Sequence, residues 1–280
     1  MESRSTRNFG RFVFLSVACS AFGFAANGFG APRPPVAKVG DVFVARTLKD
    51  FEGREEPGRR FVVATQKFVD DKQTAITEVG AGVFRFALRY RAGEWWDGDR
   101  TTSSKDRQRA EVKGLGPHPA PGETVEYRTT WRTNDAFRCG GKFCHVMQLK
   151  ALDGDDGAPL VVMTVMPDNR NAAVRICSGK NSGFTVVRQF PWTPGKWMSV
   201  AIRIKTSTGN SDKTANGAVL VSVNGDEFQG KSGIPLYRPD ATSYRPKFGL
   251  YRGVDSKKEM KIGDDWVEHK DVSAKVVAVK

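Results

Sequence analysis

A seven-residue stretch, residues 107–113, carries the side chains best suited to chemistry in this chain, and it reads RQRAEVK. If it forms a β-strand, successive side chains alternate between two faces. Its charged members then share one face, namely Arg107, Arg109, Glu111 and Lys113. Such a row is expected on a solvated face, where the groups pair with one another, or where a sheet meets a charged ligand. The guanidinium and ammonium groups in it are good donors to carboxylates.

Two further stretches separate polar from apolar side chains in the same way. The stretch CHVMQLK places Gln148 and Lys150 on one face. In that stretch His145 falls on the opposite, apolar face unless a bulge intervenes. The stretch YRPKFGLYR places Lys247 and Tyr251 on one face and directs apolar residues to the other. The three stretches together predict a polar groove that binds carboxylates.

These three stretches resemble the motif strands of the jelly-roll polysaccharide lyases. The pattern R-x-E-V lies at residues 109–112, Q-x-K at residues 148–150 and K-x-G-x-Y at residues 247–251. The alginate lyases carry R-x-E-[V/L], Q-I-H and K-A-G-x-Y in this order, and the glucuronan and heparin I lyases are looser relatives. The resemblance spans roughly residues 80–265. It implies an enzyme that cleaves a uronic-acid-containing polysaccharide by β-elimination.

The chain departs from the alginate lyase pattern at one point, because Lys150 stands where those enzymes have a histidine. Glucuronan lyases take their histidine from the region after the first motif strand, so this resemblance makes His118 the first candidate for a catalytic histidine. His145 is the second candidate, and His269 near the C-terminus is expected on the surface. The departure favours glucuronan or another glucuronate polymer as the substrate, with alginate next.

The resemblance also implies how these residues would share the work of β-elimination. The C5 proton of a uronate is weakly acidic, and its removal places more charge on a carboxylate that the site must neutralise. Arg109 and Gln148 suit that role, and Tyr251 would take the proton, protonate the leaving O4, or do both. A nearby cation, Lys247 or Lys150, favours the phenolate of the tyrosine. The expected catalytic residues are Tyr251, His118, Arg109, Gln148 and Lys150.

Substrate contacts are expected from further residues along the same groove. Glu111 is expected to hold Arg109 in place, and Arg107 and Lys113 are expected to contact flanking sugar units. Trp96 could stack on a sugar ring at the groove edge, and packing in the core is an equal alternative. The expected substrate-binding residues are Arg107, Glu111, Lys113, Lys247, His145, Arg252 and Trp96. Neither a metal ion nor another cofactor is expected, because Arg, Lys and Gln carry the necessary charge.

The remainder of the chain consists of short β-rich segments separated by turn signals, at the spacing typical of an antiparallel sandwich. We therefore predict an all-β fold, a single-domain antiparallel β-sandwich of the concanavalin-like jelly-roll type, with a concave substrate groove. Loops are expected at residues 94–100 and at residues 114–122, and the second of these carries His118. The predicted strands are residues 61–64, 82–90, 107–113, 123–132, 143–151, 160–166, 172–177, 184–190, 198–205, 218–223, 247–251 and 260–267.

The chain has 280 residues and a net charge of +13, so its surface favours a polyanion as a partner. Basic residues precede a short apolar run at residues 12–26, which predicts a secretory signal peptide within residues 1–30 and a lyase domain over residues 31–280. Export excludes nucleic acid, and no stretch is long enough for stable membrane insertion. We expect a secreted or periplasmic monomer that acts on an anionic polysaccharide, without a lipid anchor at Cys19.

The cysteines and acidic segments leave some alternatives open. Cys139 and Cys144 could close a short disulfide after export, which would leave Cys177 as the odd cysteine. Zinc is not expected from this spacing, and the acidic residues 153–157 favour a hairpin over a calcium loop. A glycoside hydrolase would need paired carboxylates on one strand face at the groove. A non-catalytic, lectin-like module for acidic glycans would need the basic residues but not the tyrosine.

Overall fold

Strands make up nearly all of the regular structure in the computed structural model, which describes residues 38–71, 73–97, 106–140, 142–179, 183–255 and 261–278. In this part of the chain the one helical element is the 3-10 turn η1 (Leu48–Asp50), and no helix is long and apolar enough to cross a membrane. The predicted all-β class is confirmed. The predicted signal peptide lies outside the described residues, so the domain boundary near residue 30 stays a prediction.

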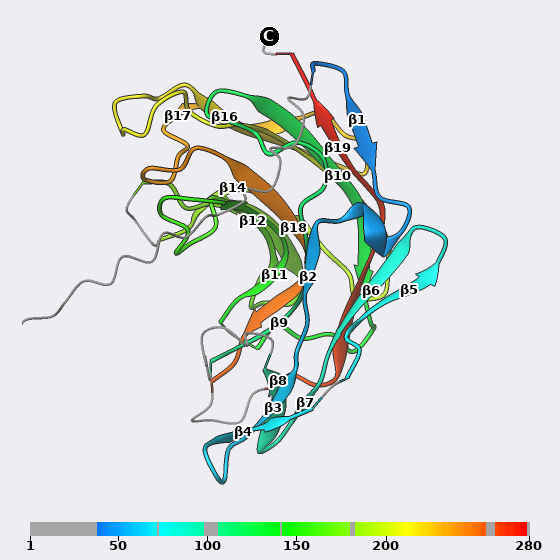
Figure 1. Cartoon of the computed structure of the whole chain (residues 1–280). Coiled ribbons are helices and arrows are strands. Elements are labelled where there is room, and N and C mark those ends of the chain that lie inside the picture. The colour runs from blue at the N-terminus through cyan, green and yellow to red at the C-terminus, as the bar shows by residue number, and fades with distance from the viewer. Residues whose placement is uncertain are drawn as a thin grey trace, which may run out of the picture. The chain divides into compact units, whose positions relative to one another are not determined.

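The first of two large facing sheets is here called the outer sheet, and every neighbouring pair of its strands is antiparallel (Figure 1). Its strands in spatial order are β17 (Gln229–Ile234), β16 (Gly217–Val223), β15 (Met198–Lys205), β10 (Thr124–Thr133), β19 (Asp265–Val276), β6 (Val83–Leu88) and β5 (Ile76–Gly80), and β1 (Val42–Val44) pairs with β19. The turn between β16 and β17 contains Asn224 and Gly225 with φ values of 51° and 84°. Positive φ at both central residues is what a two-residue Asn-Gly hairpin turn requires.

The second large sheet is here called the groove sheet, because it carries the three motif strands side by side. Its strands in spatial order are β14 (Thr185–Pro191), β13 (Asn171–Ile176), β12 (Val161–Val165), β11 (Cys144–Ala151), β18 (Tyr244–Gly253), β9 (Arg107–Lys113) and β2 (Gly53–Glu55). These pairs are antiparallel as well. Strands β11, β18 and β9 are therefore direct neighbours although residues far apart in the sequence form them.

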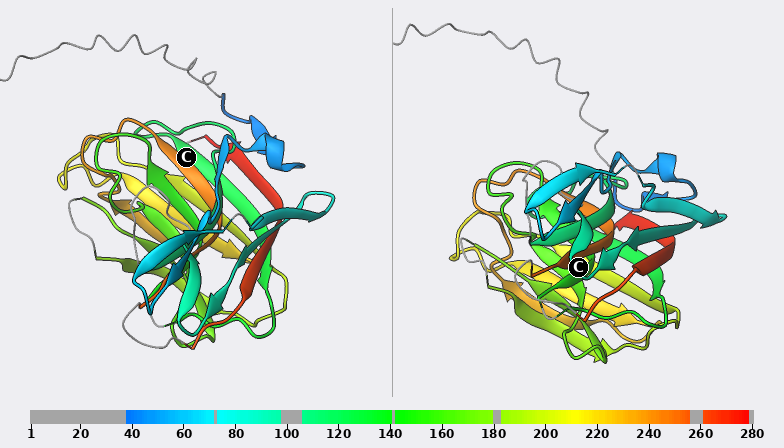
Figure 2. Two further views of the ribbon diagram at one scale, coloured as in Figure 1. Left: turned by 60° about the horizontal axis from the view of Figure 1, so that its bottom comes forward. Right: turned by 90° about the horizontal axis from the view of Figure 1, so that it is seen from below.

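A small third sheet, here called the end sheet, lies over one end of the sandwich (Figure 2). Its strands in order are β4 (Lys67–Asp70), β3 (Arg59–Val62), β8 (Glu94–Asp97) and β7 (Tyr90–Arg91). Phe61, Tyr90 and Trp95 give this sheet an apolar cluster of its own. The amide of Gln108 at the start of β9 donates to the carbonyls of Arg89 at 2.6 Å and Trp96 at 2.8 Å, which joins the end sheet to the groove sheet.

One apolar core fills the space between the two large sheets. Ala110 and Val112 of β9 point into it and are fully buried, as is Gln108, so the predicted division of faces along residues 107–113 is confirmed. Large aromatic rings pack in this core, for example Trp131, which stacks on Trp192 with 6.1 Å between ring centroids. Each fully buried side chain of this size stabilises the fold by about 1.5–3 kcal/mol.

The predicted strands at residues 107–113 and 198–205 have the same bounds as β9 and β15. The predictions for residues 94–100 and for the start of the last strand are wrong. The expected loop at residues 94–100 begins with the strand β8. Its side chains alternate, so Trp95 packs in the cluster of the end sheet and Trp96 packs in the core between the large sheets. The last strand begins at Asp265 rather than at residue 260 and extends to Val276.

Candidate active site

Tyr251 of β18 lies at the centre of the polar face of the groove sheet. Strand register places it opposite Arg109 of β9 on one side and opposite His145 of β11 on the other. Its hydroxyl accepts a hydrogen bond from Arg107 Nη1 at 3.1 Å, and the Arg109 guanidinium carbon lies 4.2 Å from the centre of its ring. The phenol therefore has two cations against it, one at the oxygen and one at the π-face.

His145 shares the groove face with Tyr251 because the strands carry a bulge at this point. The pairing of β11 with β18 shifts between His145, opposite Tyr251, and Met147, opposite Phe248. Both Val146 and Met147 belong to the core, which leaves His145 and Gln148 on the other face. The simple alternation that would place His145 on the apolar side is therefore wrong, and the bulge named as the exception is present.

The imidazole of His145 is neutral near neutral pH. His145 is only 6% exposed. The centroid of its ring lies 4.8 Å from that of Phe143 and 6.0 Å from that of Tyr251. Burial lowers the pKa of His145 to about 3, and the charges of Arg175 and Arg109 act in the same direction. Its Nδ1 atom is buried without a hydrogen-bond partner among the described residues. A neutral imidazole beside the tyrosine can accept a hydrogen bond from a bound substrate or donate one to it.

Gln148 and Arg109 are both attached to the buried Glu111. Gln148 Nε2 donates to Glu111 Oε1 at 2.5 Å, and Arg109 Nε lies 3.5 Å from Glu111 Oε2. The expected contact between Glu111 and Arg109 is therefore present. Burial raises the pKa of the Glu111 carboxyl, and Lys247 and Arg109 oppose that rise. Glu111 is fully buried, so it holds other side chains and does not contact a ligand itself.

Glu55 of β2 is a residue of this site that the sequence patterns do not reveal. Its carboxylate binds Lys247 Nζ at 2.8 Å and Arg109 Nη1 at 2.7 Å, with Lys113 Nζ at 3.7 Å. Burial alone would raise the pKa of Glu55, but the charges of Lys247 and Arg109 lower it to about 2. It comes from a strand of three residues that has no alternating pattern, and only its pairing with Glu111 brings it to this face.

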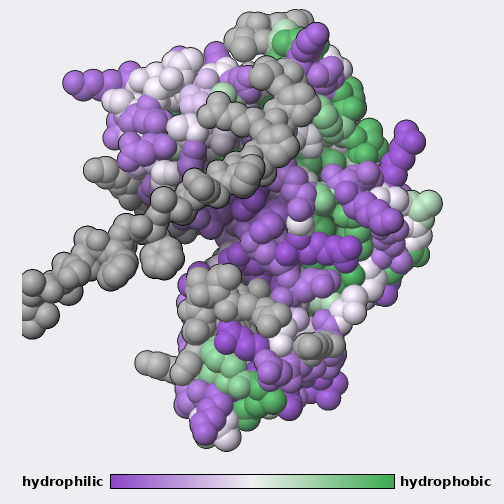
Figure 3. All heavy atoms as spheres, in the orientation of Figure 1, coloured by the Kyte–Doolittle hydropathy of each residue, from purple (hydrophilic) through white to green (hydrophobic). Residues whose placement is uncertain are grey.

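Lys247 and Lys150, two lysines of the groove face, differ in whether a ligand can reach them. Lys247 is only 2% exposed and is held by Glu55, so the prediction that it contacts substrate is not supported by its position. Lys150 is half-buried beside Gln148, and burial lowers its pKa, followed by repulsion from Lys247. Figure 3 shows the surface hollowed over β9, β11 and β18 and lined by hydrophilic residues. The predicted groove is therefore polar, and Lys150 is a cation that a ligand can reach.

A family model described as polysaccharide lyase matches residues 53–270. The chain belongs to this family. Similar solved structures include the endo-β-1,4-glucuronan lyase of the fungus Trichoderma reesei, with 16% identity, a TM-score of 0.59 and coverage of 84% of this chain and 94% of that chain. Alginate lyase Aly36B has 13% identity, a TM-score of 0.54 and coverage of 87% and 100%. The family 7 alginate lyase A1-II′ bound to substrate has 15% identity, a TM-score of 0.51 and coverage of 79% and 93%. A search among curated proteins finds no match.

These likenesses confirm the jelly-roll fold of this polysaccharide lyase, and the contacts of His118 in the structure correct the prediction made for that residue. His118 is hydrogen-bonded to Glu52. The next residue, Pro119, accepts a hydrogen bond from the backbone N–H of Tyr244 at 3.2 Å. Tyr244 lies seven residues from Tyr251 along β18, which corresponds to about 23 Å in an extended strand. His118 therefore lies at the far end of the strand and does not face Tyr251.

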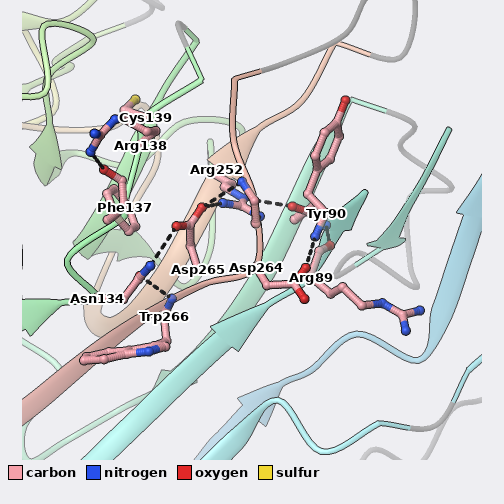
Figure 4. Close-up of polar contacts among 12 residues, drawn as sticks. Arg89, Tyr90, Asn134, Phe137, Arg138, Cys139, Arg252, Asp264, Asp265 and Trp266 are labelled. Carbon is pink, nitrogen blue, oxygen red and sulfur yellow. Dashed lines mark hydrogen bonds and ion pairs between the residues drawn. The ribbon is translucent and has the colours of Figure 1, made fainter. Parts of the chain in front are cut away.

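Arg252 of the lyase does not line the groove either, and Figure 4 shows its side chain directed toward Asp265. It follows Tyr251 in a strand, so its side chain points to the opposite face, where it is fully buried. There it pairs with Asp265, donates from Nη2 to the carbonyl of Gly263 at 2.9 Å and donates from Nε to Gln108 Oε1 at 2.8 Å. The prediction that Arg252 binds substrate is wrong, and the residue instead joins β9, β18 and β19.

Two more aromatic residues of the lyase are buried. Trp96 is 7% exposed and packs in the core between the large sheets, so packing rather than sugar stacking is its role. His269 is fully buried in β19, and the expectation of a surface position is wrong. Burial lowers the pKa of His269 to about 3. The strand predicted at residues 260–267 stops short of His269, whereas β19 extends past it, so the prediction did not treat His269 as a strand residue.

The three cysteines among the described residues of the lyase, Cys139, Cys144 and Cys177, are thiols. Burial raises the pKa of the Cys144 thiol, and a hydrogen bond with Cys139 adds to the rise. The disulfide considered between these two residues is therefore not formed, although they are close. Among the described residues, no group of three or more His, Cys, Asp or Glu side chains is arranged to hold a metal ion.

Proposed function

We propose that this polysaccharide lyase cleaves a uronic-acid-containing anionic polysaccharide by β-elimination at a site centred on Tyr251. The observation that carries the proposal is the convergence of Tyr251, neutral His145 and Gln148 on one polar face, with Arg107 and Arg109 against the phenol. We further propose glucuronan or another glucuronate polymer as the substrate, because Lys150 replaces the histidine of the alginate lyase pattern. Alginate is the next candidate.

The first step required is neutralisation of the uronate carboxylate. Gln148 uses one N–H on Glu111, and we assign its second N–H to a carboxylate oxygen of the substrate. Lys150, two residues further along β11, adds a positive charge on the same side of the tyrosine. Arg109 adds its field from the other side while its Nη1 donates to Glu55. These groups are fixed before the substrate binds, which is the condition for strong stabilisation of developing charge.

The second step is proton transfer, for which Tyr251 is the proposed catalyst. In a glucuronate unit the C5–H and C4–O bonds lie on the same side of the ring, so one group can take the proton from C5 and give it to O4. Arg107, donating at 3.1 Å, and Arg109 above the ring both stabilise a phenolate. His145, as a neutral donor, hydrogen-bonds the carboxylate as it gains enolate character.

A panel of polyuronates tests the proposal. Purified protein is incubated with glucuronan, alginate, heparin, chondroitin and ulvan, and the ultraviolet absorbance of the C4–C5 double bond is followed. Tyr251→Phe should lose at least about 100-fold in rate, since general acid–base groups contribute about 100- to 10,000-fold. Tyr127→Phe is the matched control, because that buried hydroxyl in β10 has no hydrogen-bond partner among the described residues. Near wild-type activity of Tyr251→Phe would remove the tyrosine from its role.

Two other outcomes of the panel would replace the proposal. Binding of a polymer without any rise in absorbance would support the lectin-like alternative. New reducing ends without a double bond would support hydrolysis, for which the structure offers Glu55 opposite Glu111, a carboxylate pair on neighbouring strands. Both carboxylates are occupied by ion pairs and Glu111 is fully buried, so hydrolysis is not the function we favour.

A further inference from the structure

The position of His145 depends on the bulge, and the bulge leaves backbone groups without ladder partners. Val146 has no paired residue in either neighbouring strand, since the register passes from His145 to Met147 on both sides. On β18, Gly249 and Leu250 are likewise skipped in the pairing with β11. Such unpaired backbone groups are costly in a dry core unless a side chain satisfies them.

A buried histidine from the opposite sheet lies under this bulge. His269 of β19 is fully buried, and its ring lies edge-on against Phe86 at 5.6 Å and Phe248 at 5.9 Å. Its Nδ1 is 2.9 Å from the hydroxyl of Thr129 on β10. The backbone of Gly249 and of Val146 interacts with the same ring, although no atom of the described residues forms a hydrogen bond of ordinary geometry with Nε2. The imidazole thus extends from the outer sheet to the bulge of the groove sheet.

The chemistry of the ring fits this bridging position. The Thr129 hydroxyl can donate to Nδ1 only if the proton of the neutral imidazole is on Nε2. In that tautomer Nε2 carries the N–H that can interact with the backbone of Val146 and Gly249. An imidazole buried among phenylalanines without such partners would cost free energy that an apolar side chain of similar size would avoid. The polar ring is therefore placed beside the point where the register leaves Val146 without a paired residue.

Gly249 shows how little freedom the bulge has. Its φ is +145°, and a Cβ at this position would lie 2.2 Å from the Ala110 carbonyl oxygen and 2.9 Å from Phe86 Cδ1. Strand β18 is therefore pressed against β9 and the core on one side, while His269 supports it from below. A loss of that support would leave the bulge free to shift, and His145 and Gln148 of β11 are paired with β18 on either side of it.

We propose that His269, oriented by Thr129, is a positioning residue that sustains the bulge of β11 and β18 and thereby keeps His145 on the same face as Tyr251. It does not touch the substrate. The structural part of this inference stands on the contacts of the core alone. The catalytic part rests on the proposed function, because it assumes that His145 acts in cleavage.

Paired variants test the donor rather than the volume of the side chain. His269→Leu removes both nitrogens, whereas His269→Gln keeps an N–H at the position of Nε2. We expect the amides of residues 146–148 to exchange hydrogen for deuterium at least about tenfold faster in His269→Leu, and near the wild-type rate in His269→Gln. On the polymer that the panel identifies, kcat of His269→Leu should fall by about 10- to 100-fold with KM nearly unchanged, since small displacements of catalytic groups cost this much.

The control is Val221→Ala, a core substitution in β16 of the outer sheet, away from the bulge. His269→Leu and Val221→Ala could change the amide exchange rate at residues 146–148 and kcat by equal factors. In that case His269 only fills the core, and the inference is overturned. If His269→Leu does not fold, Thr129→Val and Thr129→Ser make the same comparison, and only the valine variant should show the effects. A wild-type protein that cleaves no polymer would refute the proposed function, while hydrogen exchange would still decide the role of His269.

Discussion

Replacement of Glu55 by glutamine gives the most quantitative test of the groove's charge arrangement. Glu55 is the shared partner of Lys247 and Arg109, and its pKa falls from an ordinary value of 4.5 to about 2. At about 1.36 kcal/mol for each pH unit, this difference makes the ionised carboxylate worth about 3 kcal/mol to the folded state. Loss of one partner from a buried pair costs about 3–5 kcal/mol, which agrees, since Lys247 is 2% exposed.

The sign of the pH dependence follows from the direction of the pKa change. A carboxyl whose pKa is depressed in the folded protein contributes its stability above the unfolded pKa and loses it as the pH falls toward the folded pKa. For Glu55 this window runs from about pH 4.5 down to about pH 2. Glu55→Gln should therefore be about 3 kcal/mol less stable than wild type at pH 7 and only about 1 kcal/mol less stable at pH 3.

Urea unfolding of both proteins at the two pH values measures these differences, and the other titrating groups cancel in the comparison. Glu227→Gln, in the exposed turn between β16 and β17, is the matched control and should change stability by less than about 0.5 kcal/mol. Equal stability of wild type and Glu55→Gln at pH 7 would refute the reasoning. A difference of the same size at pH 3 would show that the amide acts through something other than the lost charge.

Three further predictions follow from the positions of single residues. Because the pKa of His145 is lowered to about 3, the pH profile of kcat/KM should not fall near pH 6.5 through protonation of this residue. A fall near pH 6.5 that disappears in His145→Asn would contradict a neutral imidazole. Arg252→Met leaves Asp265 buried without its cation, so urea unfolding should show a loss of about 3–5 kcal/mol; a loss below about 1 kcal/mol would exclude this role. His118→Ala should keep activity within about twofold of wild type in the absorbance assay, whereas a tenfold loss would return His118 to the catalytic residues.

Alternation along strands made a large part of this protein predictable. In residues 107–113 the period of two separates Arg109 and Glu111 from Ala110 and Val112, and the structure buries the apolar pair completely. The same rule excludes Arg252 from the groove face, because it follows Tyr251 directly. Composition and turn signals were sufficient for the all-β class, since both are local properties of the chain.

Features that depend on a second strand were not predictable from a single stretch. Glu55 comes from a three-residue strand, and it enters the site only because pairing with β9 places it opposite Glu111. The far position of His118 depends on where a loop leaves the sheet, which its composition does not encode. Both are consequences of register and strand order, which involve residues far apart in the sequence.

The sequence by itself determined the type of fold, the three polar strands and the tyrosine, because each is written in the order of neighbouring residues. Only the tertiary structure decided which histidine faces that tyrosine. One extra residue in a strand turns His145 from the core to the groove, and such an insertion is specified by the partner strands and by what lies beneath them. His269, from the opposite sheet, packs there against Phe248 of β18.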